Sequence, residues 1–272
     1  MVVKERLCVV IPVHKSTLTL DEERSIKACM RHLNGYDCYL VHPEGMKVVS
    51  FLKVFPGLLL KPVSPPWLAS VQGYNRMKLS LAFYDLFEQY THLLTYELDA
   101  YIFHTNFQIA NIFSFDFIGA PLFKGYLQAP ADAPFIKGCN SGFSVRNIKS
   151  CRHVLGSLDK YRNHWKFYKK VLSRFPRLSY QLNRITQGKF EVFICGMLGF
   201  HFENEHINED LAWSQVIPRL FSHFKVADSL SALKFSFEHN PERLMTLNGD
   251  ELPIGCHAWR KYVNFWGEYL ID

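Results

Sequence analysis

The first hundred residues alternate between short apolar runs and longer stretches with helical periodicity. Apolar runs at Leu7–Val13, Cys38–Val41 and Leu58–Val63 have the length of buried parallel strands. Between the first two, the capping-box sequence Thr19-Leu-Asp-Glu22 predicts the start of a helix, and Met46–Phe55 predicts another helix before the third run. This repeated alternation of strand and helix indicates an α/β fold built on a parallel sheet.

The clearest helical pattern covers Gly73–Tyr90, and the bounded apolar run His92–Tyr96 follows it directly as a further buried strand. Beyond residue 99 the pattern weakens. The later elements that it still predicts are short strands at Phe117–Ala120 and Phe143–Val145, a helical stretch over 160–189 interrupted at Pro176, and a helix at Asn208–Leu220. With no internal repeat and no low-complexity linker, we expect a single α/β domain over residues 1–272.

Composition agrees with a globular chain, because 48% of the residues are apolar and 15% are aromatic. No apolar run approaches the roughly 18 residues of a membrane-spanning helix, and the apolar stretch near the N-terminus is placed as a first strand. We therefore expect no membrane span and no signal peptide. The seven cysteines are scattered and form no C-x-x-C pair, which argues against a disulfide framework and a zinc site and favours the reducing cytoplasm.

The net charge of +6 is concentrated in one part of the chain. Between Lys160 and Phe190 there are nine Lys and Arg residues, no Asp or Glu, and several interleaved aromatic residues. This stretch is either a solvated helical face or a contact with an anionic surface, such as the inner leaflet of the membrane or a polyanionic acceptor. Nucleic acid is not the expected partner, since no nucleic-acid-binding signature accompanies the basic residues.

Two polar segments follow predicted strands, where parallel α/β sheets bind their ligands. The first is Ile11-Pro-Val-His-Lys15, whose backbone at Pro12 and Val13 can hold a base while His14 or Lys15 reaches a phosphate, although a proline often simply ends a strand. The second is the pair Glu97 and Asp99. Carboxylates two residues apart on extended backbone point the same way, and a divalent cation would offset their repulsion. An exposed acidic turn is the alternative.

Two later segments add candidate chemistry. In Asn208-Glu-Asp210, one of the two acids can serve as a general base, or both can simply interact with the helix dipole. His257, in the glycine-flanked turn Gly255-Cys-His-Ala-Trp259, is either a structural histidine or a metal ligand.

Taken together and in this order, the segments IPVHK, YNRMKLS, YELDAYIF, FIGAP, NSGFSVR, NEDLAWS and GCHAW resemble a bacterial family of glycosyltransferase-like proteins catalogued mainly as a domain of unknown function. The resemblance covers about residues 7–261. It implies an α/β fold of the GT-A glycosyltransferase type, which is a single domain with a Rossmann-like mixed sheet flanked by helices and with a DxD-type motif. Residues of about 1–120 would form the half that binds the nucleotide-sugar, and residues of about 121–272 would form the acceptor half with the basic excursion 160–190.

The resemblance also implies roles for individual residues. Asp99 and His257 would hold a divalent metal, Mn²⁺ or Mg²⁺, and Asp210, or Glu209 as second choice, would be the catalytic base. The sequence departs from the family motif in one place, because it has Glu97 where DxD has its first aspartate. The remaining roles are binding of the nucleotide-sugar by Pro12, Val13, His14, Lys15, Asn75, Arg76, Glu97 and Asp99, and binding of the acceptor by Asn140, Ser141, Gly142 and Trp259.

The function expected from the resemblance is transfer of a sugar from a nucleotide-sugar, a UDP-sugar, to a glycan or lipid-linked acceptor in cell-surface polysaccharide or lipopolysaccharide biosynthesis. Inversion at the anomeric carbon is expected if Asp210 is the base. The alternatives are a retaining GT-A enzyme, a nucleotidyltransferase and a non-catalytic carbohydrate-binding or scaffold module of the same fold. The sequence argues against a nucleotidyltransferase, because no glycine-rich phosphate loop follows the first strand. We expect the protein in the cytoplasm, in contact with the inner face of the membrane through residues 160–190.

Overall fold

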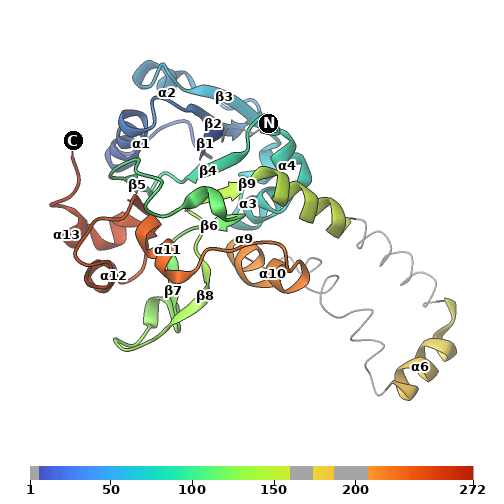
Figure 1. Ribbon diagram of the computed structural model, residues 1–272. Helices are drawn as coiled ribbons and strands as arrows, with labels where there is room; N and C mark the ends of the chain where they lie inside the picture. Colours follow the sequence, from blue (N-terminus) through green and yellow to red (C-terminus); the bar gives the residue numbers. More distant parts are fainter. Residues whose placement is uncertain (1–5, 160–173, 187–207, 272) are drawn as a thin grey trace, which may run out of the picture.

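The computed structural model describes residues 6–159, 174–186 and 208–271 (Figure 1). Its centre is a six-stranded sheet with strand order β3-β2-β1-β4-β9-β6. The strands are β1 (Leu7–Pro12), β2 (Asp37–Pro43), β3 (Leu59–Val63), β4 (His92–Tyr96), β6 (Phe117–Ile118) and β9 (Phe143–Asn147). The first four run parallel, β9 is antiparallel to β4, and β6 is antiparallel to β9, so the sheet is mixed.

Two smaller sheets extend this core. One has the order β10-β11-β5 and consists of β10 (Ser236–Phe237), β11 (Gly255–Cys256) and β5 (Tyr101–Ile102). It joins the C-terminal part of the chain to the segment that follows β4, because β11 is paired with β5 (Figure 1). The other pairs β7 (Pro121–Phe123) with β8 (Phe135–Cys139).

Helices occur along the whole described part of the chain. In chain order they are α1 (Leu20–His32), α2 (Val49–Val54), α3 (Val71–Lys78), α4 (Leu81–Asp85), a helical segment over 148–159, α6 (Pro176–Ile185), α9 (Glu209–Leu211), α10 (Ile217–Leu220), α11 (Ser229–Phe235), α12 (Pro241–Leu247) and α13 (Val263–Trp266). Shorter turns are the 3₁₀ helices η1 (Pro65–Trp67), η2 (Ile112–Ser114), η3 (Tyr126–Gln128) and η5 (Trp259–Tyr262), and a π-helical segment, η4 (Ala212–Val216), links α9 to α10.

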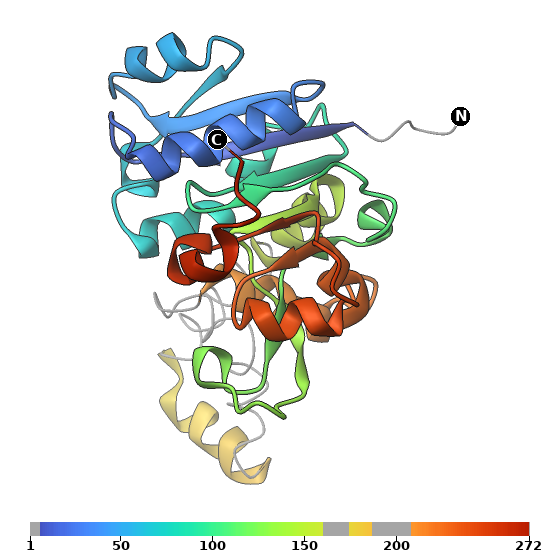
Figure 2. The same cartoon turned by 90° about the vertical axis from the view of Figure 1, so that its left-hand side faces the viewer.

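The two faces of the sheet bury different sets of side chains, as the two-residue period of a strand requires. Val9 and Leu94 lie on the face covered by α1, α2 and α11, whereas Val10 and Leu93 lie on the face covered by α3, α4 and segment 148–159. Figure 2 shows α1 lying across the first strands. Both faces are therefore covered, which explains why these strands are continuous apolar runs rather than alternating ones.

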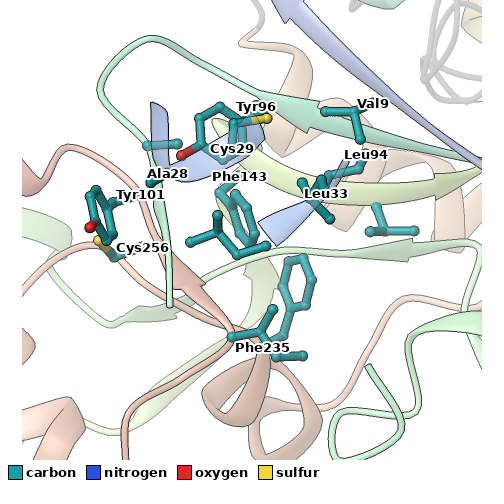
Figure 3. Packing of buried hydrophobic residues seen from close by; sticks show 14 of the residues in the cluster. Val9, Ala28, Cys29, Leu33, Leu94, Tyr96, Tyr101, Phe143, Phe235 and Cys256 are labelled. Carbon is teal, nitrogen blue, oxygen red and sulfur yellow. The ribbon is translucent and has the colours of Figure 1, made fainter. Parts of the chain in front are cut away.

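Phe143 connects the central sheet to the C-terminal elements (Figure 3). Its ring meets Tyr96 of β4 edge-on at 5.8 Å between centroids and stacks on Phe235 of α11 at 5.0 Å. Gly255 leaves room for it, because a Cβ atom there would lie 2.7 Å from the Phe143 ring. These contacts fix where β11, and the residues directly after it, stand relative to the end of β4.

The expected strands are confirmed, with β4 matching the predicted range and the others differing by a residue or two at their ends. The capping box is also confirmed: the N–H of Glu22 donates to the Thr19 hydroxyl oxygen, and the Glu22 carboxylate accepts from the N–H of Thr19. The predicted helix Met46–Phe55 is shorter and runs over Val49–Val54.

The single helix predicted over Gly73–Tyr90 is wrong, because the chain breaks between Lys78 and Leu81. Ser80 has extended backbone angles. The carbonyl of Lys78 accepts hydrogen bonds from the Tyr84 hydroxyl and from the Trp213 indole N–H. These partners come from the tertiary fold. The periodicity of the sequence does not record them.

The late helix also differs from a simple helix over Asn208–Leu220. Asn208 occupies the N-cap position, but its side chain makes no capping hydrogen bond, and a π-helical segment occupies the middle. Such π segments often occur at functional sites.

The basic stretch 160–189 lies mostly outside the described residues. Within it, α6 begins at Pro176, the position where the sequence predicted an interruption, and α6 stands apart from the sheet in both views (Figures 1 and 2). Among the residues that the structure describes, no helix is long and apolar enough to cross a membrane.

Candidate active site

A pocket of about 490 Å³ opens where β1 and β4 end. Its walls come from the segment after β1, the segment after β4, the stretch from η1 into α3, and the C-terminal turn η5. The lining residues are Pro12, Val13, His14, Glu22, Leu68, Ala69, Ser70, Val71, Tyr74, Glu97, Leu98, Asp99 and Arg260. The carboxyl ends of adjacent parallel strands thus form the pocket, as expected for an α/β sheet.

Three side chains meet at the edge of this pocket. Nε2 of His257 lies 3.2 Å from Oδ1 of Asp99 and 3.4 Å from Oε2 of Glu97. The other Glu97 oxygen accepts a 2.7 Å hydrogen bond from the Tyr74 hydroxyl. Two acids that follow β4 and an imidazole some 160 positions later, directly after β11, therefore share one small volume.

The backbone around Gly142 brings His257 to this place. A Cβ atom at position 142 would lie only 2.2 Å from Nε2 of His257, so the imidazole packs directly on the glycine backbone. The carbonyl of Gly142 accepts from the N–H of Glu97 at 3.0 Å, and its own N–H donates to Oδ1 of Asn140 at 2.9 Å. The turn Asn140-Ser-Gly142 thus supports the acid and imidazole cluster.

The charges in this cluster shift the pKa values of its members. Burial alone would raise the pKa of Glu97, but the hydrogen bond and charge of His257 outweigh burial and lower that pKa to about 2. Burial would lower the pKa of His257, yet its contacts with Asp99, Glu238 and Glu97 raise that pKa well above its usual value. Glu97 is therefore ionised at neutral pH.

The three groups suit a divalent cation. One ligand atom from each of Glu97, Asp99 and His257 can be chosen so that all lie within 4.8 Å of one another. Two carboxyl oxygens and one imidazole nitrogen are ligands that Mn²⁺ accepts readily, and Mg²⁺ also takes carboxylate oxygens. Without a cation, the only positive charge among the three is that of a protonated His257.

Glu209 lies in a different environment, although it is next to Asp210. It is 2% exposed, and its Oε2 accepts from Nη2 of Arg146 at 2.7 Å, while Oε1 accepts from the Ser141 hydroxyl and lies 3.6 Å from Nζ of Lys78. Both Arg146 and Lys78 are fully buried. We call these three residues, Lys78, Arg146 and Glu209, the buried ion cluster.

Asp210 is partly exposed and pairs differently. Its Oδ1 accepts from the N–H of Leu211 at 2.7 Å. Burial raises the pKa of Asp210 to about 6, and the negative charges of Glu209 and Glu238 add to this effect against the opposing charge of Arg146. In Glu209 the charges of Arg146 and Lys78 outweigh burial and lower the pKa instead. Asp210 is thus the acid of the pair that exchanges a proton near neutral pH.

The other residues singled out from the sequence lie in several places. Lys15 forms a 2.8 Å ion pair with Glu22, which lines the pocket. Asn75 accepts the backbone N–H of Glu209 at 3.3 Å, and Arg76 is exposed and does not line the pocket. Trp259 is 1% exposed within the apolar core, and its backbone N–H donates to the carbonyl of Asp99 at 3.3 Å.

Sequence reasoning missed three residues that shape the site, namely Lys78, Arg146 and Glu238. Lys78 lies in the segment YNRMKLS, which the resemblance singles out for Tyr74-Asn-Arg76, and Arg146 ends the segment NSGFSVR. Glu238 had no such signal. It lies in an unremarked segment, and only the pairing of β10 with β11 brings it beside His257.

The fold is that of the GT-A glycosyltransferases. A galactosyltransferase, LgtC, whose structure was solved in complex with donor and acceptor sugar analogs, matches with a TM-score of 0.50 and 11% identity over 92% of this chain and 86% of that one. The glycosyltransferase GlyE of Streptococcus pneumoniae TIGR4 matches with a TM-score of 0.45 and 13% identity over 99% of this chain and 61% of that one. At such identities the likeness concerns the fold alone.

Residues 58–257 match the family described as "Protein of unknown function (DUF5672)", and the chain belongs to this family. No curated protein matches it. The structural match to LgtC confirms the expected GT-A fold.

Substitution of Glu209 and of Asp210 by their amides should change the free energy of unfolding in opposite directions. Glu209→Gln leaves Arg146 buried without its charge partner, so the free energy of unfolding should fall by about 3–5 kcal/mol. Asp210→Asn removes a carboxylate whose pKa is higher in the folded than in the unfolded state, so stability should rise by roughly 1–3 kcal/mol at pH 7.5. Urea denaturation of both variants at pH 7.5 measures this.

The pH dependence provides the check. A raised pKa means that ionisation of Asp210 costs stability above pH 6, and this cost disappears as the pH falls from about 6 to about 4. The gain of Asp210→Asn should shrink over the same range. Equal losses in both variants at every pH would contradict the assignment of different environments.

Proposed function

We propose that this protein is a metal-dependent glycosyltransferase that moves a sugar from a UDP-sugar to a glycan or lipid-linked acceptor, with inversion, in the biosynthesis of cell-surface polysaccharide or lipopolysaccharide. The observation that carries the proposal is the meeting of Glu97, Asp99 and His257 at the edge of a pocket formed by the ends of β1 and β4. The shared fold supports it, since LgtC was solved with donor and acceptor sugar analogs.

The pocket has the size of a small-molecule site, and the donor nucleotide would lie in it. Pro12, Val13 and His14 would border the base and ribose, and the aromatic side chain of Tyr74 also lines the pocket. Two basic residues at this place already have acidic partners: Lys15, next to the lining residue His14, pairs with Glu22 at 2.8 Å, and the lining residue Arg260 pairs with Asp21 at 3.0 Å. The diphosphate therefore needs another source of positive charge.

Glu97, Asp99 and His257 would hold a divalent ion at that point. Such an ion, when bound, stabilises the charge that develops on the leaving diphosphate. Glu97 stands at the first position of the family's DxD motif. Its hydrogen bond from Tyr74 and its contact with His257 keep one oxygen directed toward the cluster, so a glutamate fits the role there.

Asp210 is the catalytic base in this proposal. With a pKa of about 6 it is ionised at neutral pH and still basic enough to take the proton of an attacking hydroxyl, a contribution of about 10²- to 10⁴-fold in rate. Glu209 does not compete for this role, because Arg146, Lys78 and Ser141 engage both of its oxygens. Glu209 instead positions Asp210 and the turn at Ser141. Direct displacement by the deprotonated hydroxyl inverts the anomeric centre.

The acceptor would approach from the side of Asp210 and the turn Asn140-Ser-Gly142. Trp259 is buried, so its part in acceptor binding would be support of the turn that carries His257. A retaining enzyme with the same metal site is the second candidate for the reaction, and a non-catalytic module of this fold is the third. Release of UDP from a panel of donors separates an enzyme from the module.

Binding of the donor gives a first prediction. A ligand that binds only the folded state raises its apparent stability, so UDP-sugars should raise the Tm in the presence of Mn²⁺ and much less without it. Asp99→Asn and His257→Ala should remove the Mn²⁺-dependent part of the shift. Asp132→Asn, an exposed acid outside the pocket, is the matched control and should keep it. Equal shifts with and without Mn²⁺ would contradict metal dependence.

Transfer gives a second prediction. Asp210→Asn should lower kcat at least about 100-fold while the Tm shift with donor and Mn²⁺ stays as in the unmodified protein. For the unmodified protein, kcat should rise with pH and level off above about 6, as Asp210 becomes ionised. Turnover of the variant within a few fold would refute the base assignment. The anomeric configuration of the product, read by NMR, decides between inversion and retention.

The proposed contact with the inner leaflet rests on α6. Leu178, Leu182 and Ile185 follow helical spacing on one face, Leu178 and Ile185 are 51% and 78% exposed, and Arg177 and Arg184 are exposed beside them. An apolar stripe with flanking arginines is typical of helices that lie on anionic membranes.

Sedimentation with liposomes tests this contact. The protein should bind vesicles containing anionic phospholipid more strongly than neutral vesicles, and Leu178→Glu with Ile185→Glu should lower the bound fraction several-fold. Leu230→Glu is the matched control, since Leu230 is equally exposed on α11. Binding that is unchanged in the double variant would refute a role of α6.

A further inference from the structure

His257 lies between carboxylates on both sides of its ring. Nε2 faces Asp99 and Glu97, the two acids that would share a metal with it. On the other side, Nδ1 lies 3.4 Å from Oε1 of Glu238. The ring therefore has one nitrogen directed at the candidate metal position and the other directed at a carboxylate that takes no part in the cluster.

The backbone fixes Glu238 and His257 relative to each other. Glu238 directly follows β10 and His257 directly follows β11, and these two strands are paired in parallel, with Phe237 opposite Cys256. The N–H of His257 also donates to the carbonyl of Phe237 at 2.9 Å. Their side chains thus leave neighbouring strands at the same level, and the contact does not depend on a flexible loop.

Glu238 is a buried acidic side chain with few polar partners. The residue is 4% exposed, and its Oε1 is close to two imidazoles, Nδ1 of His257 and Nε2 of His239, the latter at 3.3 Å. Among the residues that the structure describes, Oε2 has no hydrogen-bond partner. A buried carboxylate in such surroundings is costly, so its presence calls for a reason other than stability.

A metal-bound histidine supplies that reason. Nε2 can donate its lone pair to a metal only if the proton of the neutral ring is on Nδ1, and a carboxylate beside Nδ1 favours that tautomer and holds the ring plane. Gly142 also restricts the ring of His257, because its backbone contacts the ring so closely that no Cβ atom would fit between them.

We infer that Glu238 is a positioning residue that orients His257 and fixes its tautomer for metal binding. This inference rests on the proposed function, because it assumes that Glu97, Asp99 and His257 hold a divalent ion. Glu238 itself does not contact the ion. Loss of its carboxylate should weaken binding of the metal by about 10- to 100-fold.

Binding of Mn²⁺ alone, followed by electron paramagnetic resonance, tests the inference without any need for a substrate. In the unmodified protein, the spin-echo spectrum should show coupling of Mn²⁺ to one directly bound ¹⁴N, and His257→Ala should remove this coupling. Glu238→Gln and Glu238→Ala should weaken Mn²⁺ binding by the stated factor and reduce the ¹⁴N coupling at equal occupancy. His239→Ala, which removes the other imidazole at the same carboxylate oxygen, should leave both unchanged.

The outcomes distinguish failure of the proposed metal site from failure of the role assigned to Glu238. If the unmodified protein binds no Mn²⁺, or binds it without ¹⁴N coupling, the proposed metal site is wrong and the inference falls with it. If the unmodified protein shows the coupling and both Glu238 variants keep full affinity and coupling, only the role of Glu238 is refuted. Glu238→Gln keeps the volume of the side chain, and its unfolding temperature verifies that any loss of binding occurs in a folded protein.

Discussion

The candidate site depends on the ion pair between Arg146 and Glu209, which is fully enclosed by the fold. Arg146 comes from β9, Glu209 begins α9, and Lys78 at the end of α3 supplies the second positive charge. A buried ion of this kind is tolerated only when its partners are fixed, so the three elements must keep their mutual positions. Glu209 also accepts from Ser141, and this bond sets the turn on which His257 packs.

Adjacent residues acquire different chemistry because of this arrangement. Glu209 is neutralised by two cations and stays ionised, whereas Asp210, one position further, lacks such neutralisation and has its pKa raised to about 6 by burial and by the neighbouring acids. The same logic applies to the acids after β4, where Glu97 and Asp99 share the imidazole of His257. The four carboxylates therefore have distinct electrostatic environments within a few ångströms of one another, and the proposed roles in anchoring, proton transfer and metal binding follow these differences.

Much of the first half could be predicted from the sequence. A buried parallel strand must be continuously apolar, so the apolar runs of the sequence predict β1 and β4. Acids placed directly after β4 must lie at the edge of the sheet where ligands bind. The capping box of α1 could also be predicted, because it is a local sequence pattern. The predicted helix over Gly73–Tyr90 failed since its break depends on Tyr84 and Trp213 as partners of the Lys78 carbonyl, and periodicity carries no information on such contacts.

What the sequence determined by itself is the set of local features: the strands, the first cap, the residues at the strand ends, and the acid pair after β4. The tertiary structure alone decided which distant groups meet. It placed His257 beside Asp99, Glu238 behind His257, and Arg146 against Glu209. Local patterns reflect hydrogen bonds and burial within one segment. Contacts between residues about 20 to 160 positions apart arise only when strand pairing and packing bring the segments together, and no short stretch of sequence encodes them.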